Sequence, residues 1–159
     1  MSPIPAQIVL QWALEIERNG EALYRAVAAQ AEDREVKTLF HDLAYQEERH
    51  YRTFQRMLAK ASEPTSDPLA ADYRAFLEHA LSGALTGEGK GMQRAKESHT
   101  EEEALRAAMA FEKDTLLFFY EVADVVEPDH LPAVRAIIDE ERDHLRQLSR
   151  VLQDGPWVS

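Results

Sequence analysis

The chain contains no cysteine in its 159 residues. It therefore has no disulfide bonds, no thiolate metal site and no iron centre bound by cysteine. A protein without disulfide bonds suits a reducing compartment, and we expect this one to be cytoplasmic.

Long apolar runs and an excess of basic residues are also missing. No apolar run approaches the roughly 20 residues that span a bilayer, and the first residues lack the basic and apolar regions of a signal peptide. There are 18 Lys and Arg against 29 Asp and Glu, which gives a formal net charge of −11. Because such a surface repels polyanions, we expect neither nucleic acid nor a membrane as a partner.

The sequence also lacks the alternation of apolar and polar residues that is typical of half-buried strands. Apolar residues instead recur at three- and four-residue steps, which is the helical spacing. Asp33 and Thr100 are typical residues for the start of a helix. This pattern predicts an all-α fold with four long helices, over about Ile8–Ala31, Asp33–Lys60, Thr100–Glu127 and Leu131–Gln153.

The four helices form two pairs, at about residues 6–60 and 100–153. Short loops within each pair make its helices antiparallel neighbours. The crossover between the pairs, about residues 61–99, is long enough to run the length of the bundle. We therefore predict that residues 1–159 form one domain, a four-helix bundle of two antiparallel hairpins.

The crossover has two notable segments. Leu69–Leu81 has helical spacing and predicts a short helix. Thr86–Gly91 is rich in glycine and predicts a flexible connection.

Each hairpin repeats one polar pattern on its apolar side. A glutamate in the first helix is followed about thirty residues later by a Glu-x-x-His motif in the second. A glutamate and a histidine three residues apart lie on one helical face, so both can bind one metal ion. A carboxylate can also bridge two ions. The six candidate metal ligands are Glu17, Glu47, His50, Glu112, Glu141 and His144.

The chemistry of these side chains favours a pair of divalent cations. Four inward carboxylates would be very costly to bury without cations. Carboxylate oxygens with one imidazole per ion suit iron or manganese better than a thiolate-binding ion. We therefore predict two metal ions, and these ligands accept iron, manganese or zinc.

A single Glu-x-x-His motif carries little information. With 19 Glu and 6 His in 159 residues, about 0.7 matches are expected by chance. Three occur, and the one at Glu127–His130 lies at a proline-broken turn. The two other copies in matching register, each preceded by a core-facing glutamate, favour a metal site. A non-catalytic structural or interaction bundle is the alternative.

Several neighbouring residues have weaker signals. Tyr24 lies two turns after the first glutamate and either hydrogen-bonds a ligand carboxylate or packs in the core. Phe119 holds the matching position in the second hairpin and cannot form that bond. Glu21 is an alternative outer carboxylate. Glu48 and Glu140 are rotated about 100° from the inward face, and we expect both in solvent.

Four segments together resemble the ferritin-like superfamily, and most of all its stand-alone rubrerythrin-type domains. They are residues 13–24, 46–50, 111–114 and 139–144, so the resemblance spans nearly the whole chain. It implies a di-iron protein in which the six candidates are the ligands and Tyr24 is the tyrosine that follows the first of them. The implied reaction is oxidation of Fe(II) with O2 or peroxide.

Two features depart from rubrerythrins. Without cysteine the chain has no rubredoxin-like iron centre, so the alternative activity, peroxide reduction, requires a separate electron-transfer protein. Thr115 stands where rubrerythrins tend to carry a further glutamate, which argues against the redox-dependent ligand exchange of that family.

Apolar residues at outward positions predict self-association. The outward positions hold more aromatic residues than a short crossover can cover, namely Trp12, Phe76, Phe118 and Tyr120. Exposed apolar patches usually mark contacts between chains. We therefore expect a homodimer, with Gly87–Gly91 as a hinge for helix exchange.

Overall fold

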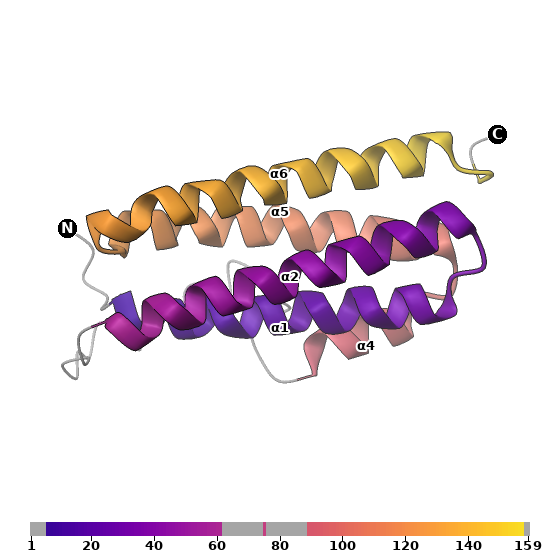
Figure 1. Cartoon of the computed structure of the whole chain (residues 1–159). Coiled ribbons are helices and arrows are strands. Elements are labelled where there is room, and N and C mark those ends of the chain that lie inside the picture. The colour runs from indigo at the N-terminus through magenta and orange to yellow at the C-terminus, as the bar shows by residue number, and fades with distance from the viewer. Residues whose placement is uncertain (1–5, 62–74, 76–88, 158–159) are drawn as a thin grey trace.

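Four long helices form the framework of the molecule (Figure 1). The computed structural model describes residues 6–61, 75 and 89–157. Within these residues no helix is both long and apolar enough to cross a membrane. The elements are α1 (Ala6–Gln30), α2 (Arg34–Lys60), α4 (Lys90–Glu97), α5 (Glu101–Val125), the 3₁₀ turn η1 (Pro128–His130) and α6 (Leu131–Asp154).

The helices pair as two antiparallel hairpins, α1 with α2 and α5 with α6. The hairpins pack together through contacts of α1 with α5 and of α2 with α6, and the short helix α4 lies along α1. The predicted all-α bundle of two antiparallel hairpins is confirmed.

The helix starts follow the local chemistry of the sequence. The Asp33 carboxylate accepts a hydrogen bond from the Val36 N–H at 3.0 Å, which caps α2. The Thr100 hydroxyl accepts one from the Glu103 N–H at 3.1 Å, which caps α5. Each cap satisfies a backbone donor that has no partner within the first turn of its helix. Both predicted caps are confirmed.

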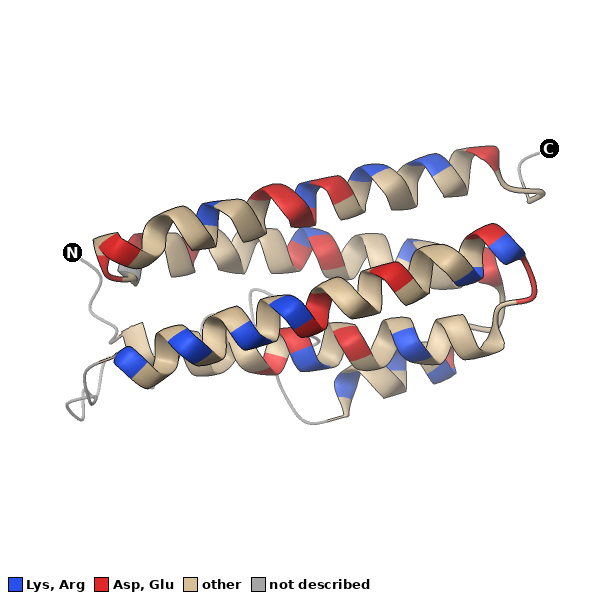
Figure 2. Cartoon of the chain, viewed as in Figure 1, with Lys and Arg blue, Asp and Glu red and all other residues tan. Residues whose placement is uncertain are grey.

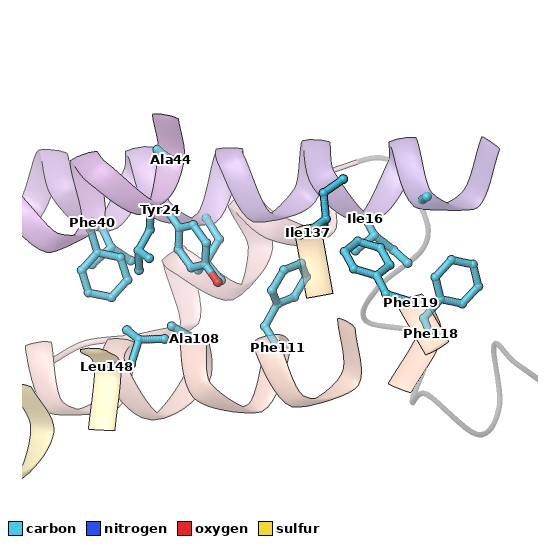
Figure 3. Close-up of a cluster of buried hydrophobic side chains, with 14 of the residues drawn as sticks. Ile16, Tyr24, Phe40, Ala44, Ala108, Phe111, Phe118, Phe119, Ile137 and Leu148 are labelled. Atoms are coloured by element: carbon cyan, nitrogen blue, oxygen red, sulfur yellow. The ribbon is translucent and has the colours of Figure 1, made fainter. Parts of the chain in front are cut away.

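Aromatic and aliphatic side chains fill the space between the helices (Figure 3). The Tyr24 ring lies 5.7 Å from that of Phe40 and 6.2 Å from that of Phe111, between ring centroids. The Phe54 and Phe119 rings lie 5.2 Å apart. This packing excludes water from the middle of the bundle, so the polar side chains there are shielded from solvent.

The crossover differs from its prediction where the structure describes it. The predicted helix at Leu69–Leu81 lies outside the described residues, Ala75 excepted. The flexible connection predicted as far as Gly91 is wrong at Lys90 and Gly91, because both lie in α4, where Gly91 is buried. Its N–H donates to the Asn19 side-chain oxygen at 3.3 Å. Gly91 therefore serves close packing of α4 on α1, whereas Gly89, with φ of 79°, precedes the helix.

Replacement of Gly91 by alanine is expected to destabilise the protein by about 1–3 kcal/mol, the usual penalty for overpacking. A β-carbon at Gly91 would lie 1.9 Å from the Asn19 carbonyl oxygen, so α4 or α1 must shift. Urea denaturation gives the free energy of unfolding, with Lys90→Ala as the exposed control on the same helix. Equal values for Gly91→Ala and the control would contradict the close packing.

Two of the aromatic residues assigned to an exposed patch are buried. Trp12 and Phe118 are each 2% exposed, and their rings pack 6.2 Å apart where α1 meets α5. Only Tyr120, at 50% exposed, is on the surface as expected, while Phe76 lies outside the described residues. The homodimer stays a prediction, and light scattering tests it.

Candidate metal centre

Acidic residues gather at mid-length on the four long helices (Figure 2). At this level α1 and α5 each contribute one inward glutamate, and α2 and α6 each contribute a glutamate and a histidine one turn apart. Of these side chains, five are 0% exposed and His50 is 2% exposed. The six are the predicted candidates: Glu17, Glu47, His50, Glu112, Glu141 and His144.

The six residues form two overlapping groups of four. In each group, one nitrogen or carboxylate oxygen per residue lies within 4.8 Å of the others. Glu47 and Glu141 belong to both groups and therefore lie between the two positions. The first group is completed by Glu17 and His50, and the second by Glu112 and His144.

The two histidines present the same nitrogen to the middle of the centre. Their rings stack with centroids 6.0 Å apart and planes 20° from parallel. The Nδ1 atom of His50 lies 2.8 Å from Oε1 of Glu141, and that of His144 lies 2.9 Å from Oε2 of the same residue. One carboxylate thus contacts both imidazoles, one through each oxygen.

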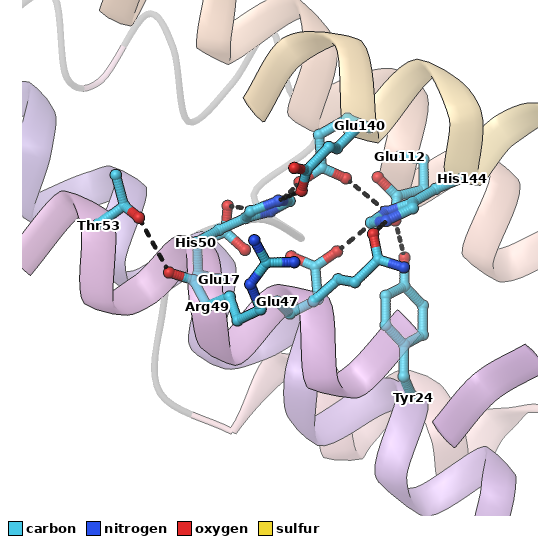
Figure 4. A network of polar contacts seen from close by, with 11 residues as sticks. Glu17, Tyr24, Glu47, Arg49, His50, Thr53, Glu112, Glu140 and His144 are labelled. Carbon is cyan, nitrogen blue, oxygen red and sulfur yellow. Dashed lines mark hydrogen bonds and ion pairs between the residues drawn. The ribbon is translucent and has the colours of Figure 1, made fainter. Parts of the chain in front are cut away.

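The outer histidine nitrogens contact the opposite hairpin (Figure 4). Nε2 of His50 lies 2.6 Å from a Glu140 oxygen, and Nε2 of His144 lies 2.7 Å from the Gln46 side-chain oxygen. Carboxylate and amide oxygens accept hydrogen bonds, so each Nε2 carries a proton. In the neutral imidazole that binds a metal ion, Nδ1 is then the nitrogen that faces the ion.

The expectation that Glu140 lies in solvent is only partly met. Its side chain is still 37% exposed, but it bridges the gap between α6 and α2 to reach His50. The repeat held a signal for this contact, because alignment of the two motifs places Gln46 on Glu140, a polar residue in both copies. Glu48, in contrast, pairs at the surface with Arg25 and Arg52.

Tyr24 and its counterpart Phe119 differ as predicted. The buried Tyr24 hydroxyl donates a hydrogen bond to Oε1 of Glu112. Phe119 packs against Phe54 and offers no polar atom to the centre. Glu21 is outside both groups of four and pairs with Arg25 at 2.8 Å.

Most carboxylate oxygens of the centre lack hydrogen-bond donors. Neither oxygen of Glu17 or Glu47 has a hydrogen-bond partner, nor does one oxygen of Glu112, whereas the two oxygens of Glu141 face the Nδ1 atoms of the histidines. Buried acceptors without partners are strongly unfavourable, so these oxygens need cations. Carboxylate oxygens and imidazole nitrogens are ligands for iron, manganese and zinc. The residues therefore fit the two metal ions predicted from the sequence.

Burial changes the acidity of the glutamates in opposite directions. Loss of hydration raises the pKa of Glu17, Glu47 and Glu112, and the charge of Glu141 raises the last two further. Burial alone would also raise the pKa of Glu141, but its contacts with His144 and His50 lower it well below its usual range. Among the four glutamates of the centre, Glu141 is thus the one whose ionised form the surroundings favour without metal.

The histidines are held in the charged form when no metal is bound. Burial alone would lower the pKa of both, but the surrounding carboxylates outweigh this effect and raise it. Glu17 and Glu140 act most on His50, and Glu112 and Glu141 act most on His144. A metal ion that binds here must displace these protons.

The metal-free protein is expected to lose stability as pH rises from 5 to 8. The pKa values of the two histidines and of Glu47 are raised above their usual values. These groups therefore bind more protons in the folded than in the unfolded protein over this range, and stability falls as pH rises. The lowered pKa of Glu141 acts oppositely, but its stabilisation is complete above about pH 5 and is lost only at lower pH.

With metal bound, stability should instead rise with pH, because fewer protons compete with the metal for the ligands at higher pH. Melting temperatures at pH 5.5, 6.5 and 7.5, with chelator or with excess Zn(II), measure both trends. Glu47→Gln, which removes one of the raised carboxyl groups, should flatten the metal-free profile. Parallel profiles with and without metal would contradict this account.

Comparison with known proteins agrees with the fold. The family model for rubrerythrin matches residues 9–152. A Thermotoga maritima protein, described as a candidate ferritin-like diiron-carboxylate protein, has a similar structure, with a TM-score of 0.71 and 24% identity over 97% of this chain and 98% of that one. A DUF305 fragment from Deinococcus radiodurans also has a similar fold, with a TM-score of 0.66 and 18% identity over 95% and 98% of the two chains.

No curated protein matches the sequence. The family match nevertheless covers both hairpins and all six candidate ligands. The resemblance noted in the sequence is therefore confirmed, and the chain belongs to the rubrerythrin family.

Proposed function

We propose that this protein binds two iron ions at the centre and oxidises Fe(II) with O2 or hydrogen peroxide. The observation that carries the proposal is the set of buried carboxylate oxygens that have no hydrogen-bond partner between two inward-facing imidazoles. Glu17 and His50 would hold one ion and Glu112 and His144 the other. Glu47 and Glu141 would contact both.

Two Fe(II) ions supply two electrons. With two protons, these convert O2 to hydrogen peroxide, or hydrogen peroxide to two molecules of water, and leave two Fe(III) ions. This electron count matches a site for a pair of ions.

The protein itself contributes exclusion of water and one protonated hydroxyl. The fully buried Tyr24 lies beside Glu112, and burial together with this carboxylate raises its pKa well above the usual 10. Tyr24 therefore keeps its proton at neutral pH and donates a hydrogen bond to Oε1 of Glu112. It is the candidate residue for orienting this ligand.

Single-turnover oxidation tests the proposal. The protein is loaded with two equivalents of Fe(II) without oxygen and mixed with O2 or hydrogen peroxide, and ferric absorbance is followed. Glu47→Ala with His50→Ala should reduce oxidation to the rate of free Fe(II). Glu48→Ala with His41→Ala removes the same residue types from partly or fully exposed positions of α2 and should leave the rate unchanged. Equal rates in both double variants would overturn the proposal.

Peroxide reduction with an external electron donor is a second candidate. Because the chain has no cysteine to bind a donor centre of its own, the electrons would come from a separate electron-transfer protein. Continuous consumption of hydrogen peroxide only when an electron-transfer protein is added would support it. A single burst of oxidation under both conditions would favour simple Fe(II) oxidation.

A further inference from the structure

The centre is asymmetric although the helices that build it repeat. When the two Glu-x-x-His motifs are superposed in sequence, Gln46 falls on Glu140, and the preceding glutamates place Tyr24 on Phe119. Both differences lie directly against the candidate ligands.

The first difference concerns the histidines. Nε2 of His50 donates to a carboxylate, that of Glu140, at 2.6 Å. Nε2 of His144 donates to a neutral amide oxygen, that of Gln46, at 2.7 Å. Hydrogen bonds to a charged acceptor are about twice as strong as those between neutral groups. A carboxylate partner also makes the imidazole a stronger metal ligand.

The second difference concerns the terminal glutamates. Glu17 has both oxygens free of hydrogen bonds. Glu112 shares Oε1 with the Tyr24 hydroxyl, which draws negative charge away from the metal. Both differences therefore act in the same direction and leave more electron density at the His50 position than at the His144 position.

We propose that the two metal positions are inequivalent, with the His50 position binding the first ion more tightly because Glu140 supports His50 whereas neutral Gln46 supports His144. This inference rests on the two-metal centre of the proposed function. It makes Glu140 and Gln46 positioning residues, which act on the metal through the histidine of the opposite hairpin.

Reciprocal substitutions test the assignment. Co(II), which is not oxidised under these conditions, is titrated calorimetrically into Glu140→Gln, Gln46→Glu and the unmodified protein. Glu140→Gln should weaken the tighter step by about 10-fold or more, the usual effect of losing such a partner. Gln46→Glu should instead strengthen the weaker step. The double exchange should narrow the difference between the two steps without removing it, because the Tyr24 contact with Glu112 remains.

Matched controls change charge without touching a histidine nitrogen. Asp139→Asn removes a charge from the exposed residue next to Glu140, and Gln55→Glu adds one at an exposed position of α2. Both should leave each step within about 2-fold, the scale of screened surface charges. Metal-free melting temperatures identify any variant with a damaged fold.

The outcomes separate this inference from the proposed function. Two unequal steps in the unmodified protein are not sufficient support, since repulsion between ions produces them even in a symmetric centre. If the controls shift the steps as much as Glu140→Gln and Gln46→Glu do, or if Glu140→Gln acts on the weaker step, the inference is wrong while the centre stands. No binding of Co(II) would overturn both.

Discussion

Replacement of Glu141 by glutamine is expected to abolish binding of both metal ions, whereas Glu17→Gln or Glu112→Gln should abolish only one. Glu141 is a member of both groups of ligands, but Glu17 and Glu112 each belong to one. Glutamine keeps the size of the side chain and removes its charge. The loss of affinity should exceed about 100-fold, because loss of a mere hydrogen-bond partner to a ligand already costs about 10–100-fold.

Equilibrium dialysis against Mn(II) or anaerobic Fe(II), followed by elemental analysis, measures these stoichiometries. The expected values are two ions per chain in the unmodified protein, one in each single-group variant and none in Glu141→Gln. Glu121 is a partly buried acid further along α5, and the control variant Glu121→Gln should still bind two ions. If Glu17→Gln and Glu141→Gln lost the same number of ions, Glu141 would not be shared.

Metal binding is also expected to raise the melting temperature by on the order of 20 °C. An ion present at 1,000 times its dissociation constant stabilises the native state by about 4 kcal/mol, so two ions add about 8 kcal/mol. In proteins of this size each kcal/mol shifts the melting temperature by about 2–4 °C. Calorimetry with chelator and with excess metal measures the difference.

Glu47→Gln provides the sharpest control for this effect. Because burial and Glu141 raise the pKa of Glu47, its charge destabilises the metal-free fold. The variant should therefore melt at or above the temperature of the metal-free parent, but it should gain almost nothing from added metal. A metal-free structural bundle predicts instead that neither protein responds to chelator or metal.

The main features of the fold and the centre could be predicted from the sequence because they depend on one helix at a time. Helical spacing gave the four long helices, and Asp33 and Thr100 marked where two of them begin. The candidate ligands were predictable because acids and imidazoles on apolar faces are rare and here occur in register. The structure then brings all six together.

The features that could not be predicted depend on two helices at once. Glu140 is rotated away from the core of its own helix, and only the approach of α2 brings its carboxylate to His50. Gly91 has the local composition of a loop, yet its lack of a side chain lets α4 contact the backbone of Asn19. Trp12 and Phe118 cover one another where α1 meets α5, which neither helix shows by itself.

Anomalous X-ray diffraction from crystals loaded anaerobically with Fe(II), measured at the iron absorption edge, tests the two-metal centre most directly. We predict two peaks inside the bundle, one next to Nδ1 of His50 and Glu17 and the other next to Nδ1 of His144 and Glu112, with Glu47 and Glu141 between them. A single peak, or iron bound only at surface carboxylates, would contradict the two-metal centre.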